Sequence, residues 1–248
     1  MVGSSLANKL KKNKKIETVI ESTRKDTDLF FFDETQKKIQ TEKPNVIINC
    51  AAMVGGIVAN NEMRTEFIIN NLKINLNILE SIKNYRDIGM INLGSSCIYP
   101  LDAETPIKEE SLMTGKLEPT NSPYAMAKLC AIEIGDSMAM QYGHNILNLM
   151  PTNLYGQNDN FSPTNSHVIP GLITRMHKAK TENKDSFDVW GTGKPLREFL
   201  HVDDLSDAIE FLIENNIVNG TYNIGSGEEV SIYDLAQKIK KVIKFEGE

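Results

Sequence analysis

Residues 90–97 are Met90-Ile91-Asn92-Leu93-Gly94-Ser95-Ser96-Cys97. The first four form a short apolar run that ends at a glycine, and such a run predicts a buried β-strand. Three hydrogen-bonding side chains follow it immediately. Open α/β sheets bind their ligands beyond the carboxyl ends of the strands, so we expect Ser95, Ser96 and Cys97 to lie at a ligand site.

A second motif is the pair Tyr124 and Lys128, which are four residues apart. This spacing places both side chains on one face of a helix. Ser122 and Pro123 predict the N-cap and the first residue of that helix, which should run to about Tyr142. A lysine ammonium on this face would lower the tyrosine pKa from about 10 and make it a proton donor or acceptor. A packed tyrosine beside a solvated lysine is the alternative.

Strand-like and helix-like segments alternate along the chain. We expect strands at Ile16–Ile20, Val46–Cys50, 90–94 and 146–150, and helices at 62–84, 122–142 and 168–182. This alternation predicts an α/β fold with a Rossmann-like, doubly wound parallel sheet and helices on both faces.

The domain organisation follows from the same pattern. We expect a dinucleotide-binding domain at 1–155 and 197–225, and a smaller substrate lobe, incomplete at the C-terminus, at 156–196 and 226–248. A dinucleotide-binding fold opens with a strand, a glycine-rich turn and a helix. The opening Met1-Val2-Gly3 matches only the last glycine of that turn, so the first strand is expected to be missing from the middle of the sheet.

The composition excludes several classes of protein. The 248 residues are 40% hydrophobic, which suffices for a sizeable core, and the net charge of −6 argues against nucleic acid or an anionic membrane as partner. Cys50, Cys97 and Cys130 form neither an even disulfide framework nor a metal-ligand spacing. No segment approaches 18 apolar residues. We therefore expect a cytoplasmic protein without a metal.

Several blocks of the sequence resemble a known family. They include Gly3, Ala51-Ala52, Gly94-Ser95-Ser96, Tyr124-x-x-x-Lys128 and Arg197-x-Phe199-x-His201-Val202-x-Asp204. Together they are similar to the extended short-chain dehydrogenase/reductases of nucleotide sugars, within the NAD-dependent epimerase/dehydratase family. Further blocks resemble the GDP-L-fucose synthases of that family: Ala51–Ile57, Gly94–Pro100, Leu117–Asn121, Met150–Gly156 and Asn165–Pro170.

The resemblance implies a reaction in two stages. GDP-4-keto-6-deoxy-D-mannose would be epimerised at carbons 3 and 5, and its carbon-4 ketone would then be reduced by NADPH. By the same resemblance, Cys97 is the base and His167 the acid of the epimerisation. Tyr124 and Ser95 would bind the ketone oxygen, while Lys128 tunes Tyr124 and holds the nicotinamide ribose. A buried hydrophobic role for Cys97 and a loop role for His167 are the alternatives.

The resemblance also implies which residues bind the ligands. Arg175, Trp190 and Arg197 would bind the GDP-sugar, where a guanidinium suits phosphate oxygens. The cofactor residues would be Gly3, Arg24, Leu93, Gly94, Ser95, Ser96, Lys128, Pro151, Thr152, Asn153, Leu154 and His167. Arg24 favours NADP (NADPH), whereas Glu21 would favour NAD, which we consider the second choice. A homodimer is also implied, with helices 62–84 and 122–142 as its expected interface.

Two other interpretations remain open. One is a different nucleotide-sugar epimerase or 4,6-dehydratase, although such dehydratases carry an acidic pair where this chain has Ser96-Cys97. The other is a non-catalytic protein, because losing the backbone N–H groups that cradle a pyrophosphate would weaken cofactor binding.

Overall fold

The centre of the molecule is a parallel sheet. The structure, a computed structural model, describes residues 1–162 and 166–248. Within them, four strands pair in the order β1-β2-β3-β6. These are β1 (Val46–Asn49), β2 (Gly89–Leu93), β3 (Ile146–Pro151) and β6 (Gly220–Ile224). β2 and β3 are buried along their whole length, as central strands of a covered parallel sheet should be. The predicted α/β fold is confirmed.

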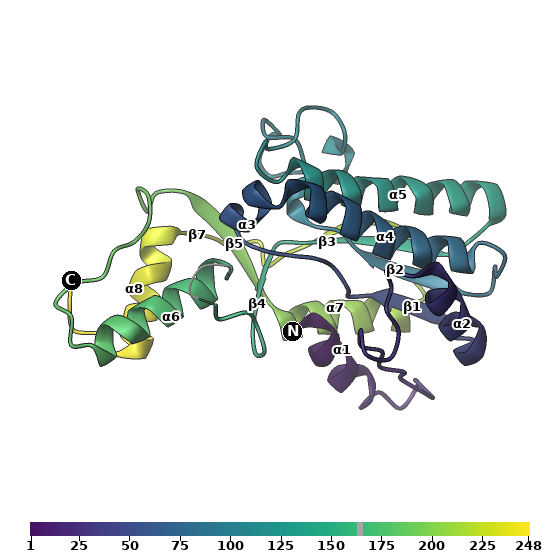
Figure 1. The fold of residues 1–248 in the computed structure, drawn as a ribbon, viewed down its shortest axis with the longest axis horizontal. Coiled ribbons are helices and arrows are strands. Elements are labelled where there is room, and N and C mark those ends of the chain that lie inside the picture. The colour runs from purple at the N-terminus through teal and green to yellow at the C-terminus, as the bar shows by residue number, and fades with distance from the viewer. Residues whose placement is uncertain (163–165) are drawn as a thin grey trace.

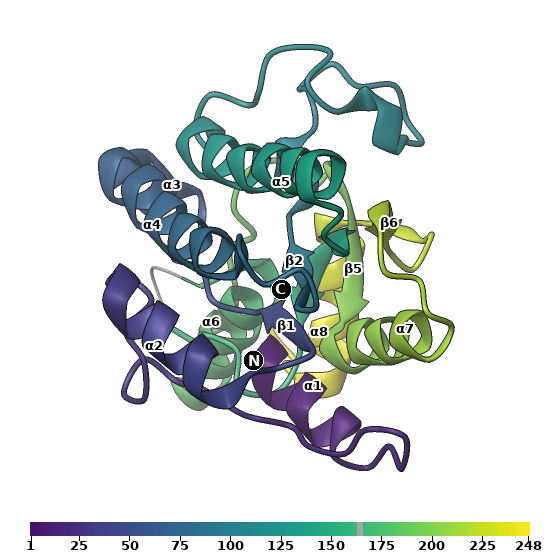
Figure 2. The same cartoon turned by 90° about the vertical axis from the view of Figure 1, so that its right-hand side faces the viewer.

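Helices cover both faces of this sheet (Figures 1 and 2). α2 (Phe32–Glu42), α4 (Arg64–Ile82) and α5 (Ser122–Tyr142) lie on one face, and α1 (Val2–Leu10) and α7 (Val202–Glu214) lie on the other. Successive side chains of β2 pack on opposite faces of the sheet. Met90 packs towards α4 and α5, whereas Ile91 and Leu93 pack towards α1 and α7. The helices predicted at 62–84 and 122–142 are confirmed, and a short helix, α3 (Ile57–Glu62), precedes α4.

A row of buried asparagines fixes α4 and α5 on the sheet. Asn49, Asn92 and Asn148 are neighbours across β1, β2 and β3. The Asn49 amide donates to Asn75 of α4 over 2.9 Å, and the Asn148 amide donates to Asp136 of α5 over 3.2 Å. Each bond joins a strand to a helix, so the row sets where both helices lie above the strand ends.

A smaller sheet lies beside the central one. β4 (Asn153–Tyr155) pairs in parallel with β5 (Leu196–His201), and β5 pairs antiparallel with β7 (Glu229–Ser231). α6 (Val168–Thr181) and α8 (Ile232–Ile243) lie side by side at this end of the molecule and share an apolar core with the sheet (Figure 1). The helix predicted at 168–182 is confirmed as α6, while the division into two domains stays a prediction.

The strand predicted at Ile16–Ile20 is wrong. Among the described residues this segment has no ladder partner and no regular secondary structure, although Ile16 and Val19 still pack against the core. The doubly wound order places such a strand beside the first strand of the fold, and the sheet here has the half-exposed β1 as its edge. An apolar pattern predicts burial, but a strand also needs a neighbour that completes its hydrogen bonds.

None of the helices in the described part of the chain is both long enough and apolar enough to span a lipid bilayer.

Candidate active site

The turn after β2 places the first group of predicted residues. Gly94 has no room for a side chain, because a Cβ there would collide with the Met150 sulfur of β3. The backbone therefore leaves the strand tightly against β3. Ser95 follows and caps the short 3₁₀ helix Ser96–Ile98, with its Oγ accepting from the Cys97 N–H at 3.5 Å. Ser95 and Cys97 are thus held at the carboxyl end of β2.

The first turn of α5 brings Tyr124 and Lys128 to the same place. The Ser95 side chain is close enough to the Tyr124 hydroxyl to lower its pKa. Lys128 is buried, its Nζ donates to the Leu93 carbonyl over 2.7 Å, and it lies 5.8 Å from the centre of the Tyr124 ring. The residue preceding α5 is Asn121, so the prediction that Ser122 is the N-cap is wrong by one position.

The electrostatics differ from the expected Tyr–Lys couple. Burial raises the pKa of Tyr124, the neighbouring Cys97 raises it further, and the hydrogen bond with Ser95 offsets only part of this. Burial also lowers the pKa of Lys128 to about 8. The prediction that Lys128 lowers the tyrosine pKa is therefore wrong here, because desolvation has the largest effect and Ser95, not Lys128, is the group that lowers this pKa. At neutral pH, Tyr124 is a neutral phenol and can donate a proton.

Cys97 is subject to opposing effects. Burial raises the pKa of its thiol, while the hydrogen bond with Ser95 and the positive charge of Lys128 lower it, with burial the stronger. The thiol is therefore the prevailing form at neutral pH. A role as base requires a ligand environment that stabilises the thiolate, and Lys128 is the cation placed to do so.

His167 is the exposed N-cap residue of α6. Its neighbour Ser166 lies against the loop after β1, since a Cβ on Gly56 would be 3.1 Å from the Ser166 carbonyl oxygen. Gly55 in that loop faces the Phe67 ring, which stands edge-on to the Tyr124 ring at 6.3 Å. Packed contacts therefore run from Tyr124 to the start of α6. Asn165, at the start of this sequence block, lies outside the described residues.

Asparagines hold that loop in place. The Asn71 side chain accepts from the Met53 N–H at 2.9 Å and donates to the Met53 carbonyl at 3.0 Å, as a neighbouring strand would. Asn60 donates to the carbonyls of Gly55 and Gly56. Sequence reasoning missed both asparagines. Both could have been found as polar residues at helix positions that face the core, where an amphipathic helix normally has apolar residues.

Two of the three predicted substrate residues meet on the smaller lobe. The Arg175 guanidinium lies 3.8 Å from the centre of the Trp190 ring, and Arg175 also donates to the Gly171 carbonyl. Trp190 is 66% exposed. Arg197 stands exposed on β5, and the structure gives it a hydrogen bond to its neighbour's carbonyl, that of Leu196, rather than a contact with this pair.

The predicted cofactor residues are spread over the strand ends. Gly3 lies in the first turn of α1, where its Cβ would be 3.6 Å from that of Cys50 at the end of β1. Thr152 follows Pro151 of β3, and its buried Oγ1 has no hydrogen-bond partner among the described residues. Asn153 and Leu154 are in β4. A helix N-terminus and an unpaired hydroxyl at one sheet edge fit a nicotinamide dinucleotide.

Arg24 lies on an exposed turn. Its guanidinium pairs with Asp28 at 3.2 Å and covers the Phe30 ring, while Glu21 pairs with Lys11. Arg24 and Glu21 are thus exposed and each is paired with another side chain of the protein, so the geometry favours neither form of the cofactor.

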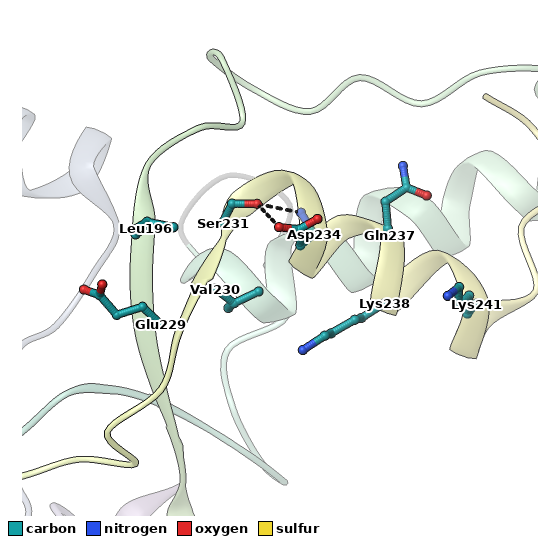
Figure 3. Close-up of a pocket in the computed structure, with 8 residues that line it drawn as sticks. All are labelled: Leu196, Glu229, Val230, Ser231, Asp234, Gln237, Lys238 and Lys241. Carbon is teal, nitrogen blue, oxygen red and sulfur yellow. Dashed lines mark hydrogen bonds between the residues drawn. The ribbon is translucent and has the colours of Figure 1, made fainter.

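A hollow of about 420 Å³ lies away from this site, between β5, β7 and α8 (Figure 3). Lys238 and Lys241 of α8 line it together with Leu196 and Glu229, and Ser231 hydrogen-bonds with Asp234 at its rim. None of the residues lining it belongs to the predicted site, so this hollow does not mark the chemistry.

The fold and the site define a class of protein, a Rossmann-like α/β protein with a serine, a tyrosine and a lysine converging at the carboxyl end of a central strand. The chain belongs to the NAD dependent epimerase/dehydratase family, whose model matches residues 1–225.

Named relatives narrow the comparison. The chain is 45% identical to the putative GDP-L-fucose synthase 2 of Arabidopsis thaliana, over 100% of this chain and 75% of the relative. It is similar to a GDP-L-fucose synthetase from Naegleria fowleri solved with NADP, with 30% identity and a TM-score of 0.87 over 99% and 76% of the two chains. It is also similar to MlghC, a GDP-mannoheptose C4 reductase from Campylobacter jejuni with NADP bound, with 31% identity and a TM-score of 0.89 over 100% and 82%.

Proposed function

We propose that this chain is an NADPH-dependent GDP-L-fucose synthase. It epimerises GDP-4-keto-6-deoxy-D-mannose at carbons 3 and 5 and then reduces the carbon-4 ketone. One observation carries the proposal: Cys97 lies directly beyond Ser95, beside both Tyr124 and Lys128, at the end of β2. The similarity to GDP-L-fucose synthases along the whole chain supports the same substrate.

The epimerisation needs an acid, a base and a stabilised oxyanion. Both epimerised carbons neighbour the ketone, so removal of a proton leaves an enolate with its charge on the ketone oxygen. Ser95 and the neutral phenol of Tyr124 donate to that oxygen. Cys97 removes the proton from one face, with Lys128 stabilising its thiolate, and His167 returns a proton on the other.

The reduction uses the same phenol. NADPH, when bound, supplies the hydride to carbon 4, and Tyr124 gives its proton to the resulting alkoxide. Lys128 then compensates the negative charge left on the tyrosine. Gly3, Thr152 and Lys128 would hold the cofactor, and Arg175 with Trp190 would hold the GDP end of the substrate.

The remaining features of the proposal have indirect support. NADP is the preferred cofactor because two similar structures contain it. Residues 1–155 and 197–225 would bind it, and 156–196 and 226–248 would bind the sugar nucleotide. A homodimer through α4 and α5 would cover their exposed apolar side chains, which are Ile69, Leu76, Met126 and Met140. A cytoplasmic location suits three cysteines that are free.

The experiment follows NADPH oxidation and solvent deuterium together. With the 4-keto sugar in D₂O, the protein should oxidise NADPH and give a product deuterated at carbons 3 and 5. Cys97→Ser should lower the exchange rate by about 10²-fold or more, because a serine hydroxyl is a far weaker base than a thiolate. Cys130→Ser, on the same helix as Tyr124, is the matched control and should leave exchange unchanged. Normal exchange in Cys97→Ser would remove Cys97 from the mechanism.

A second candidate function is a C4 reductase that does not epimerise. The raised pKa of the Cys97 thiol and the likeness to the C4 reductase favour it. The same assay separates the two, since NADPH oxidation without deuterium at carbons 3 and 5 would identify the reductase. Absence of both signals would identify a non-catalytic protein.

A further inference from the structure

Arg64 ties the beginning of α4 to the beginning of α5. Its Nη1 donates to the Pro119 carbonyl over 2.8 Å and to the Thr120 carbonyl over 3.4 Å, and its Nη2 donates to the Ser122 Oγ over 3.3 Å. One guanidinium therefore bonds to three of the four residues from Pro119 to Ser122, where the chain turns into α5. A planar fork with five donors suits such a multiple contact.

The start of α5 depends on this outside support. Asn121 precedes the helix but makes no side-chain capping bond. Its N–H instead donates to the Glu118 carboxylate over 2.9 Å, and the Thr120 hydroxyl donates to the same oxygen. Against the effect of burial, these hydrogen bonds and the charge of Arg64 lower the pKa of Glu118. The turn is thus held by Arg64 at its carbonyls and by Glu118 at its donors.

This turn determines where the Tyr124 hydroxyl lies. Tyr124 is the third residue of α5, so a shift of the turn moves it relative to Ser95. One turn beyond Arg64 on α4, Phe67 stands edge-on to the Tyr124 ring at 6.3 Å. α4 therefore constrains the tyrosine twice, with Phe67 at its ring and Arg64 at the turn that precedes it.

We propose that Arg64 is a positioning residue that acts on proton transfer through Tyr124. The inference rests on the proposed function for its kinetic test. Misplacing a reacting group by about 1 Å can cost about 10²-fold in rate.

A double-mutant cycle tests the proposal. Arg64→Ala should lower kcat for ketone reduction about 10- to 100-fold, with the KM for NADPH nearly unchanged. Combined with Tyr124→Phe, it should have almost no further effect, because the group that it positions is gone. Full additivity of the two losses would overturn the proposal. Guanidinium ion at millimolar concentration should partly restore the Ala variant. Arg86→Ala, at an exposed position beyond α4, is the matched control.

A second measurement does not depend on activity. Amide hydrogen exchange at residues 121–125 should become faster in Arg64→Ala and be partly restored in Arg64→Lys, which keeps one donor group. Unchanged exchange would overturn the proposal whatever the kinetics. If the Ala variant fails to fold, Arg64→Lys is carried through both measurements with a smaller expected effect. Lack of NADPH oxidation by the wild-type chain would count against the proposed function, while the exchange result would still decide the role of Arg64.

Discussion

The two sides of the candidate site are built differently. At the end of β2, Lys128 is only 2% exposed and hydrogen-bonds to the Leu93 carbonyl, and Tyr124 is held by Ser95 and Phe67. On the smaller lobe, Trp190 is 66% exposed and stacks on Arg175, and its loop passes through Gly191 with φ +75°. One side is set into the core and the other lies on the surface.

The difference follows from what each side has to do. Proton transfer needs groups held at fixed distances in a medium where charges act strongly, and burial supplies both. A nucleotide diphosphate can instead be held by a guanidinium and an aromatic ring, whose contacts tolerate adjustment. We therefore expect changes on the buried side to affect kcat or the pH dependence of stability, and changes on the exposed side to act mainly on binding.

The largest effect is expected for Tyr124→Phe. In the proposed mechanism the phenol is the proton donor, and general acid catalysis typically contributes 10²–10⁴-fold, so kcat for NADPH oxidation should fall by about that factor. The ring contact with Phe67 is retained, so the thermal midpoint should change little. Steady-state kinetics and thermal unfolding measured on the same sample separate the two effects. A loss of kcat below about tenfold would mean that another group protonates the ketone oxygen.

Tyr85→Phe is the matched control for that substitution. It removes a phenol that accepts a hydrogen bond from Gln40 on the surface, and Tyr85 precedes β2 whereas the site residues Ser95 and Cys97 follow it. Its kcat should equal that of the wild type.

Much of the buried side could be predicted from the sequence. The apolar run before Gly94 and the helix signals at Ser122 and Pro123 are local, so they place Ser95 and Tyr124 on the right elements. The convergence of these elements follows from the general rule that parallel strands end at one edge of a sheet. The structure agrees with the strand and the helix that these local patterns predict, although the N-cap is Asn121 rather than Ser122.

Other features could not be read from local patterns. The segment 16–20 has a strand-like composition, yet strand formation depends on a neighbour that sequence periodicity does not reveal. The raised Tyr124 pKa follows mainly from burial of the phenol, and the sequence does not show how deeply that side chain is buried. The role of Arg64 could not be predicted, because the sequence does not show that the beginnings of α4 and α5 lie side by side.

The next effect concerns Lys128 and pH. Its pKa in the folded chain is about 8, below the ordinary 10.5, so the unfolded chain binds this proton more tightly. The unfolding free energy should therefore rise as the pH is raised from about 8 to about 10.5, by up to about 3 kcal/mol, and this group adds no slope below pH 8. The unfolding free energy of Lys128→Met should not show this rise with pH. Urea unfolding of both proteins between pH 7 and pH 10 measures the difference.

Lys73→Met, at an exposed position of α4, is the control for that series, and its difference from the wild type should not vary with pH. If the wild type and Lys128→Met also differ by the same amount at every pH, Lys128 is not desolvated and the buried side is more open than the structure indicates.

The smallest effect on kcat is expected for Trp190→Ala. An exposed ring that covers one guanidinium contributes about 0.5–1 kcal/mol, so the thermal midpoint should fall by a few degrees at most. The KM for the sugar nucleotide should rise several-fold with kcat nearly unchanged, because Trp190 would bind the GDP end equally in the ground state and in the transition state. Trp190→Phe keeps an aromatic face for Arg175, so its KM for the sugar nucleotide should lie between those of the wild type and Trp190→Ala. A fall in kcat as large as that of Tyr124→Phe would show that the exposed side takes part in the chemistry, and the contrast between the two sides would then fail.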